Sequence, residues 1–329
     1  MNFTPILPVI TVPNLDDSSV TWFQSRPSKW TLSIVGLGDV GGTLAQALCI
    51  MGSDAIKEIK LFDLDPNRLS RYILELNQIL GPFTASIPVR ATDQHDLFKA
   101  DMVIFTASKS VPAVGEQVQD MRMIQFESNA QLVRNFVKEG VGQNFQGLYA
   151  IVSDPVDLLC QVARDALEHY GQQDHASIRI KGFGLGVMNA RAMYYARNIG
   201  CETFENSGRV YGPHGKDLIV VNDIGDQFDE ALSERLRELT VQANIEVRAL
   251  GFKPYIAPAV SSAAYSIKAC IEGYWHYSTV PWHRQFLGCL NIFDQNPLME
   301  SLPSHPTLVT WLKNTLTTME RDYATLHSL

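Results

Sequence analysis

The chain lacks the long apolar run that a membrane-spanning helix requires, because no stretch approaches about 18 consecutive apolar residues. At its N-terminus it also lacks the basic start and compact apolar core of a signal peptide. Clustered positive charge is absent too. The formal net charge is −8 and the lysines and arginines are scattered, whereas proteins that bind a nucleic-acid backbone present a basic surface. We therefore expect a cytoplasmic protein with neither a membrane nor a nucleic acid as its partner.

Cysteine is scarce, and its spacing excludes two kinds of site. The five cysteines form no CxxC pair and have mostly apolar neighbours (Cys49, Cys160, Cys201, Cys270 and Cys289). We expect buried free thiols, neither a disulfide framework nor a zinc site, and no other metal site. Internal repeats and low-complexity tracts are also lacking. A chain of 329 residues, 46% of them hydrophobic, then predicts a globular protein with room for two domains.

What the chain does contain is the motif Gly36-Leu37-Gly38-Asp39-Val40-Gly41, directly after the apolar residues 32–35. Three glycines at this spacing behind a strand predict a tight turn and a helix start, where free backbone N–H groups hold a pyrophosphate. Glycines also cluster in ordinary turns, so the alternative is a plain strand-turn-helix unit. The surroundings favour a nucleotide site, because residues 43–51 continue as an apolar helix and residues 56–62 are typical of a second strand.

An acidic residue follows that second strand at a distance typical of dinucleotide sites. Asp63 comes about 20 residues after the last glycine, where a carboxylate accepts hydrogen bonds from an adenine ribose. Asp65 lies close by in the sequence and no arginine follows the strand immediately, so a 2′-phosphate would meet negative charge. The sequence therefore favours NAD over NADP as the cofactor.

Strands and helices alternate from residue 30 onward, which predicts the α/β class with a Rossmann-type doubly wound parallel sheet. The further elements expected in this part are strands at residues 86–90, 100–106, 147–152 and 177–181, and helices at residues 119–139 and 155–170. From about residue 181 the pattern changes to that of an α+β substrate domain. The elements expected there are a helix from residue 187, strands at residues 209–211 and 218–221, helices at residues 227–250 and 257–272, and a closing helix from residue 307.

These patterns divide the chain into three parts. Residues 1–29 form an N-terminal arm, residues 30–180 an NAD-binding Rossmann domain, and residues 181–329 a domain for substrate binding and oligomerisation. The arm carries four prolines and no sustained periodicity. We expect it either to pack on a neighbouring subunit or to be disordered.

Further polar motifs follow the glycine motif in a fixed order, and together they are more specific than any one of them. They are Thr106-Ala107-Ser108, Arg122 with Asn129 seven residues on, Ser153-Asp154-Pro155-Val156-Asp157, Asn189-Ala190-Arg191 and Gly212-Pro213-His214-Gly215. In this order and spacing the chain resembles the L-lactate/malate dehydrogenase family, from about Trp30 to the C-terminus and most strongly through residue 215. The resemblance implies hydride transfer between the nicotinamide of NAD and C2 of a small 2-hydroxy or 2-keto acid, in a homodimer or homotetramer.

The resemblance also assigns roles to individual residues. His214 takes the place of the catalytic acid/base that exchanges a proton with the substrate hydroxyl, Arg191 that of the carboxylate anchor, and Arg122 that of the arginine on a mobile loop that polarises the substrate carbonyl. A histidine beside a glycine turn and an arginine on a helix are, by themselves, more often ordinary surface residues. The residues implied to bind the cofactor are Gly36, Gly38, Asp39, Val40, Gly41, Asp63, Thr106, Ala107, Ser108, Asn129 and Ser153.

Two positions depart from the family pattern. Met188 stands where the family has the aspartate that holds the second nitrogen of the catalytic histidine, and Asp154 stands where it has a substrate-binding asparagine. A thioether is a poor acceptor for the imidazole N–H. We expect Asp154 to take over part of the electrostatic role of the missing aspartate and so to favour the protonated His214. The alternative is a dinucleotide-binding pseudoenzyme with little or no turnover.

The substrate is constrained mainly by the start of the mobile loop. Family members that take dicarboxylates carry an extra arginine there, whereas residues 108–112 contain none. A monocarboxylic acid is therefore favoured, although Lys109 adds a positive charge nearby. Small residues at 257–262 leave room for a substituent larger than methyl. His276 and His283 lie among aromatic residues, which is more typical of packing than of a second site.

Overall fold

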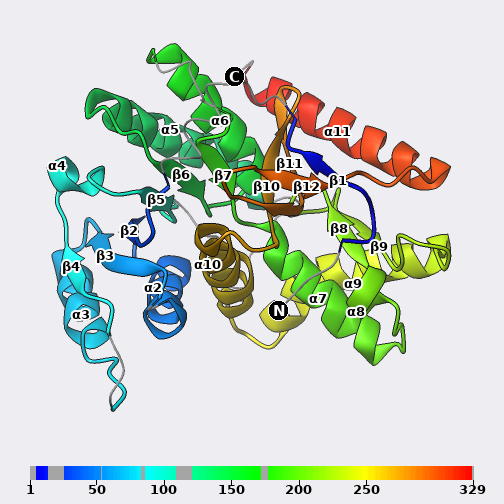
Figure 1. The fold of residues 1–329 in the computed structure, drawn as a ribbon, viewed down its shortest axis with the longest axis horizontal. Helices are drawn as coiled ribbons and strands as arrows, with labels where there is room; N and C mark the ends of the chain where they lie inside the picture. The colour runs from blue at the N-terminus through cyan, green and yellow to red at the C-terminus, as the bar shows by residue number, and fades with distance from the viewer. Residues whose placement is uncertain are drawn as a thin grey trace.

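The computed structural model of the chain describes residues 5–13, 26–52, 54–82, 86–108, 121–171 and 177–327. Three sheets are formed by these residues: one of six strands, one of four and one of two. The six-stranded sheet and its helices come from the first half of the chain, and the two smaller sheets come mainly from the second half (Figure 1).

The six-stranded sheet is parallel throughout and has the order β4-β3-β2-β5-β6-β7. Its strands are β2 (Trp30–Val35), β3 (Ile56–Phe62), β4 (Val89–Ala91), β5 (Met102–Phe105), β6 (Leu148–Ile151) and β7 (Ile180–Gly182). The chain order reverses between β2 and β5, and a doubly wound sheet binds ligands outside the carboxyl ends of its strands at such a point. The predicted α/β fold class is confirmed.

Helices cover both faces of this sheet. They are α2 (Asp39–Met51), α3 (Pro66–Leu76), α4 (Gln94–Leu97), α5 (Met121–Gly142) and α6 (Val156–His169). In Figure 1, α5 and α6 lie above the sheet and α2 and α3 below it. Alternate residues of one strand therefore enter different cores: Ile104 of β5 packs in the core with α2, whereas Val103 and Phe105 pack in the core with α5 and α6.

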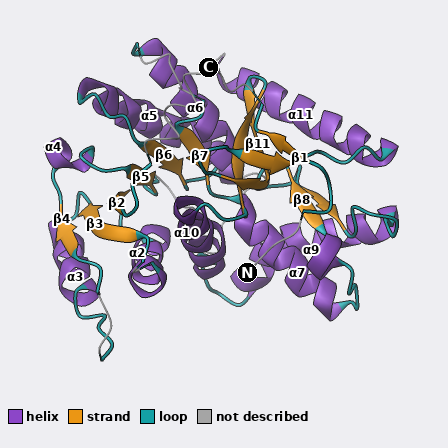
Figure 2. Ribbon diagram, viewed as in Figure 1, coloured by secondary structure: helices purple, strands orange, loops and turns teal. Residues whose placement is uncertain are grey.

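The second half of the chain combines helices with two antiparallel sheets, as Figure 2 shows by colour. Its helices are α7 (Leu185–Asn198), α8 (Phe204–Ser207), α9 (Glu230–Ala249), the π-helix η1 (Pro258–Ala264), α10 (Tyr265–Glu272) and α11 (Pro306–His327). Its strands are β8 (Arg209–Tyr211), β9 (Ile219–Val221), β10 (His276–Trp282), β11 (Gln285–Ile292) and β12 (Leu298–Glu300). The helix predicted from residue 257 is present, but Pro258–Ala264 form the π-helix η1 and only the following residues form the α-helix α10.

The N-terminal strand β1 (Val9–Thr11) joins the four-stranded sheet, whose order is β1-β12-β11-β10. Val9 and Thr11 are paired with Glu300 and Leu298 of the same chain, and Figure 1 shows the dark blue β1 beside this sheet. At these residues the structure differs from both expectations for the arm. The strand is too short and too exposed to be recognised from its own sequence, because its pairing partner lies near the other end of the chain.

A buried ion pair fixes this N-terminal region to the second half. The guanidinium of Arg209 on β8 lies 2.6 Å from Oε2 and 2.8 Å from Oε1 of Glu300, and both side chains are almost fully buried. Glu300 Oε1 also accepts a hydrogen bond of 2.9 Å from the backbone N–H of Ile6. The pair therefore joins β8, β12 and the segment before β1.

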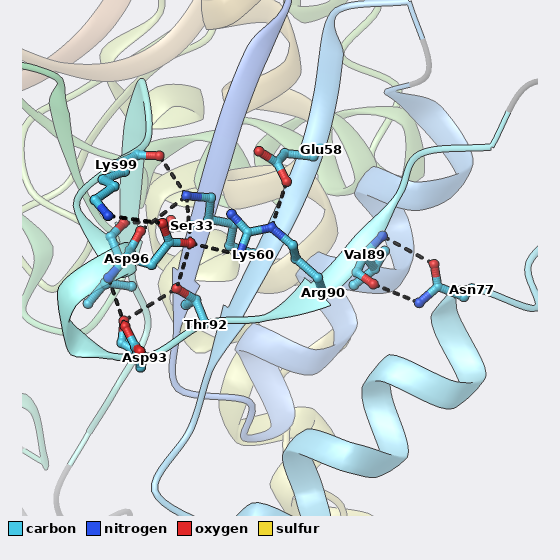
Figure 3. Close-up of polar contacts among 11 residues, drawn as sticks. Ser33, Glu58, Lys60, Asn77, Val89, Arg90, Thr92, Asp93, Asp96 and Lys99 are labelled. Atoms are coloured by element: carbon cyan, nitrogen blue, oxygen red, sulfur yellow. Dashed lines mark hydrogen bonds and ion pairs between the residues drawn. The ribbon is translucent and has the colours of Figure 1, made fainter.

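A second polar cluster links β3 and β4, the two strands at one end of the parallel sheet (Figure 3). Lys60 on β3 is buried, and its Nζ lies 3.0 Å from the carboxylate of Asp96 and donates to the carbonyl of Lys99 at 2.7 Å. Arg90 on β4 lies 2.7 Å from the same carboxylate. Burial by itself would raise the pKa of Asp96, but the hydrogen bonds from Lys60 and Arg90 outweigh it and lower that pKa to about 2. The cluster holds β3, β4 and α4 together.

Candidate cofactor and active site

The glycine turn lies between β2 and α2 and has the shape that a diphosphate needs. Gly36 has a φ of +91°, and a Cβ there would come within 2.9 Å of the Ala107 backbone. A Cβ on Gly41 would lie 1.9 Å from the carbonyl oxygen of Gly36. At Gly38, in contrast, no atom of the described residues lies within 4 Å of the Cβ position, apart from the neighbouring backbone. The turn is therefore packed closely against protein atoms at Gly36 and Gly41, whereas the space beside Gly38 is open. This shape fits a dinucleotide.

Asp63 follows β3 and faces this turn. One carboxylate oxygen accepts a 2.6 Å hydrogen bond from the backbone N–H of Leu37, and the other accepts one of 2.8 Å from that of Asp65. Arg68, on α3, lies 3.4 Å from Asp63 and 3.5 Å from Asp65. Arg68 was not anticipated from the sequence, because it lies five residues after Asp63 and not directly after the strand. The first turn of α3 brings its guanidinium close to both carboxylates.

A cleft runs along the carboxyl edge of the parallel sheet and is closed on its other side by the second half of the chain. It collects most of the predicted cofactor residues from the ends of β2, β3, β5 and β6. Those that line it are Gly36, Gly38, Asp39, Val40, Asp63, Thr106, Ala107, Ser108 and Ser153. Gly41 and Asn129 do not line it. Gly41 packs against the backbone of Gly36, and Asn129 is hydrogen-bonded to the backbone of Asp154, and both of these partners line the cleft.

Side-chain hydrogen bonds hold this edge of the sheet together. Thr106 Oγ1 donates to the carbonyl of Gly36 at 2.6 Å, and Ser153 Oγ donates to the carbonyl of Ala107 at 2.8 Å. Asn129, fully buried on α5, donates through Nδ2 to the carbonyl of Asp154 at 2.8 Å. These three hydrogen bonds tie the ends of β5 and β6 to the glycine turn and to α5.

The second half of the chain brings His214 to the same cleft. The imidazole Nδ1 lies 3.0 Å from Oδ1 of Asp154, which is 60 residues earlier in the chain. The backbone N–H of His214 donates to the carboxylate of Asp157 at 3.1 Å, and Asp157 is buried in the first turn of α6. Both His214 and Asp154 line the cleft. An acid and an imidazole therefore meet where the first and second halves of the chain face each other.

Arg191 and Met188 lie one turn apart on α7. Met188 is fully buried in an apolar cluster with Leu185 and Val220. The Arg191 guanidinium lies 3.7 Å from the Met188 sulfur and donates a short hydrogen bond to the side-chain oxygen of Asn244 on α9. Asn244 lines the cleft, whereas Arg191 is not among the residues that line it. Arg122 belongs to α5, but its side chain lies outside the described residues, as does the whole of Lys109.

Other side chains of the cleft were not anticipated from the sequence. One face of α9 contributes Val241, Asn244, Ile245 and Arg248, and the loops contribute Lys216 and Lys253. The positions on α9 are spaced i, i+3, i+4 and i+7, which is the spacing of one helical face. That spacing was visible in the sequence, but which face turned to the cleft was not. Of the small residues at 257–262, only Pro258 and Ser262 line the cleft.

Of the two histidines expected to pack among aromatic residues, His276 is buried and His283 is exposed. His276 is buried and hydrogen-bonded to the carbonyl of Tyr274 at 2.9 Å and to Ser278 Oγ at 3.0 Å, and burial lowers its pKa to about 3. It is therefore a neutral packing histidine. All five cysteines are free, and four of them are buried; burial raises the pKa of Cys160 well above its usual value.

The described residues form neither a cluster suited to a metal ion nor a helix suited to span a membrane. No group of three or more histidine, cysteine, aspartate or glutamate side chains there is arranged to hold a metal ion. No helix in the same residues is both long and apolar enough to cross a membrane.

Comparison with known sequences connects this geometry to one group of proteins. A family profile described as "lactate/malate dehydrogenase, NAD binding domain" matches residues 30–173. The L-lactate dehydrogenase of Treponema denticola is 30% identical over 188 residues, which cover 57% of this chain and 55% of that enzyme. The L-lactate dehydrogenase of Zea mays is 26% identical over 277 residues, covering 79% of this chain and 74% of that enzyme.

Comparison with solved structures shows that the fold extends over nearly the whole chain. The malate dehydrogenase of Archaeoglobus fulgidus, solved in complex with NADH, matches with a TM-score of 0.74 at 17% identity. The match covers 90% of this chain and 99% of that one. At this identity the likeness establishes a shared fold.

Proposed function

We propose a function for this chain from the family to which it belongs, that of the lactate/malate dehydrogenases. NAD is its cofactor. The proposed reaction is hydride transfer between the nicotinamide and C2 of a small 2-hydroxy or 2-keto monocarboxylic acid. The observation that carries this proposal is the contact of 3.0 Å between His214 Nδ1 and Asp154 Oδ1 at the carboxyl edge of the sheet, because it supplies an acid/base in the cleft that the predicted cofactor residues line.

In this mechanism His214 holds and moves the proton. Asp154 accepts a hydrogen bond from Nδ1–H, orients the ring and stabilises the imidazolium, so that Nε2 exchanges a proton with the substrate oxygen. Asp157 fixes the backbone of His214 through its 3.1 Å hydrogen bond. NAD, when bound, supplies or accepts the hydride at its nicotinamide. Reduction of a keto acid then takes its proton from His214, and oxidation of a hydroxy acid returns it.

Arg191 is proposed to hold the substrate carboxylate. A guanidinium binds a carboxylate with two parallel hydrogen bonds, which fixes the orientation of C2. Asn244 holds the guanidinium on one side and Met188 packs against it on the other. Arg122 remains the proposed loop arginine. The assembly into a homodimer or homotetramer and the cytoplasmic location likewise remain proposals.

The proposed function is tested by mixing the purified protein with NADH and a series of 2-keto monocarboxylic acids of increasing side-chain length. We expect absorbance at the NADH band to fall with at least one of them, and to fall more slowly with a keto dicarboxylate. A thermal shift with NADH alone measures cofactor binding separately. Tight NADH binding without turnover on the whole series would contradict the proposed reaction and favour the dinucleotide-binding pseudoenzyme.

Replacing Asp154 by asparagine is expected to lower kcat for keto-acid reduction by about 10- to 100-fold, the range typical when an opposite charge beside a titrating group is removed. The reduction should also lose activity at a lower pH than in the wild type, because the imidazolium that donates the proton is no longer stabilised. Kinetics across a pH series measure both effects.

The exposed Asp226 provides the matched control, and Asp226→Asn should leave the pH profile unchanged. Equal or higher activity in Asp154→Asn would show that Asp154 has no such role. A second variant separates charge from shape: Asp154→Glu keeps the carboxylate and should retain more activity than Asp154→Asn.

A further inference from the structure

The first residue of α2 is an acid, which is unexpected at a helix end that receives a diphosphate. Asp39 directly follows Gly38 and lines the cleft. The N-terminus of a helix attracts phosphate through its unpaired N–H groups and its dipole. A carboxylate at the same point repels phosphate. The chain must therefore either accept weaker cofactor binding or neutralise Asp39.

A lysine from the second half of the chain reaches this acid. Lys253 Nζ lies 3.1 Å from Asp39 Oδ2, and the two residues are 214 positions apart. Lys253 belongs to the loop between α9 and η1, and it lines the cleft together with Asp39 and Gly38. Its side chain is 51% exposed, so it has room to turn from the carboxylate toward a ligand. A positive charge thus stands at the open side of the glycine turn.

An arginine also lines the cleft that Lys253 lines. Arg248 is on the face of α9 that lines the cleft, one turn after Asn244. Asn244 contacts Arg191, the proposed anchor of the substrate carboxylate, and Lys253 contacts Asp39 at the glycine turn. Arg248 therefore falls between these two points along the chain. Within the described part of the chain it makes no ion pair, whereas Lys253 makes one with Asp39.

We propose that Lys253 and Arg248 bind the diphosphate of the cofactor from the second half of the chain, and that Lys253 also offsets the charge of Asp39. The glycine turn then holds the diphosphate on one side and the two cations hold it on the other. Binding NAD in this way couples the second half of the chain to the first. The inference rests on NAD as the cofactor and is independent of turnover.

The test measures dissociation constants of NADH, ADP and adenosine by calorimetry for the wild type, Lys253→Met, Arg248→Met and the double variant. Because the lysine is half exposed, each single variant should bind NADH and ADP about 3- to 10-fold more weakly, and the double variant more weakly still. Adenosine has no phosphate, so its affinity should not change. Arg235→Met, at an exposed position on α9 that does not line the cleft, is the control and should match the wild type.

Asp39→Asn separates this proposal from a purely structural role for the ion pair. If Lys253 serves the diphosphate, removing the acid should strengthen NADH binding by a few-fold and should partly restore it in Lys253→Met. If the ion pair only joins the two halves of the chain, Asp39→Asn should weaken NADH binding as Lys253→Met does. The latter result, or equal losses of NADH and adenosine binding in Lys253→Met, would overturn the proposal.

Discussion

Replacing His214 by glutamine is expected to lower kcat for keto-acid reduction by about 10²- to 10⁴-fold, the contribution typical of a positioned acid/base. Glutamine fills a similar volume and leaves the backbone N–H of residue 214 free to keep its hydrogen bond to Asp157. What is lost is the group that gains and loses a proton near neutral pH. Steady-state kinetics with the best keto acid of the series measure the effect.

NADH affinity separates this chemical role from damage to the fold. His214 is contributed by the second half of the chain, whereas the glycine turn and Asp63 are in the first. We therefore expect His214→Gln to bind NADH with nearly unchanged affinity and to melt within a few degrees of the wild type. His95→Gln, at an exposed position on α4, should leave turnover unaffected. A kcat for His214→Gln within threefold of the wild type would exclude His214 as the acid/base.

Replacing Arg209 by methionine is expected to lower the free energy of unfolding by about 3–5 kcal/mol, because it leaves the buried carboxylate of Glu300 without its partner. Glu300 then keeps the hydrogen bond from the backbone N–H of Ile6. Urea unfolding of the variant and of the wild type measures the loss.

A double variant tests whether the unpaired charge of Glu300 causes the loss of stability. Arg209→Met/Glu300→Gln removes the charge together with its partner, so it should be more stable than Arg209→Met alone. Arg71 and Glu75 form an ion pair of similar length, 2.8 Å, on the exposed side of α3, and Arg71→Met should change stability little. If Arg209→Met and Arg71→Met lose the same stability, burial is not what makes the Arg209 pair important.

The cofactor half of the site was predictable because its signals are local. The strand before Gly36, the helix after Gly38 and the acid at the end of β3 are all read within a short stretch of sequence, and backbone sterics require glycine at Gly36 and Gly41. The parallel sheet followed from the alternation of apolar segments. The ends of the predicted helices and strands were displaced by a few residues from those in the structure, because turns and caps fix the ends less strongly than periodicity fixes the middle.

The rest of the wall of the cleft was not predictable. Outside the cleft, the strands β10, β11 and β12 were also missed, although β10 pairs with β11 and β11 with β12, its neighbours along the chain. Lys253 carries no signal of its own as a loop lysine, and its contact with Asp39 bridges 214 positions. Arg68 was missed for a related reason, because one turn of α3 brings it back to Asp63.

By itself the sequence determined that this chain forms a glycine-rich turn behind a strand, because φ and ψ preferences and apolar periodicity act between near neighbours. It also supplied His214 at the position that the resemblance implies and Asp154 at a position that departs from the family pattern, and it led us to expect that the two interact. Only the tertiary structure decided that Asp154 lies 3.0 Å from His214 while Met188 is buried beside Arg191. The physical reason is that such pairs form where separate elements pack against each other, and packing depends on the whole fold.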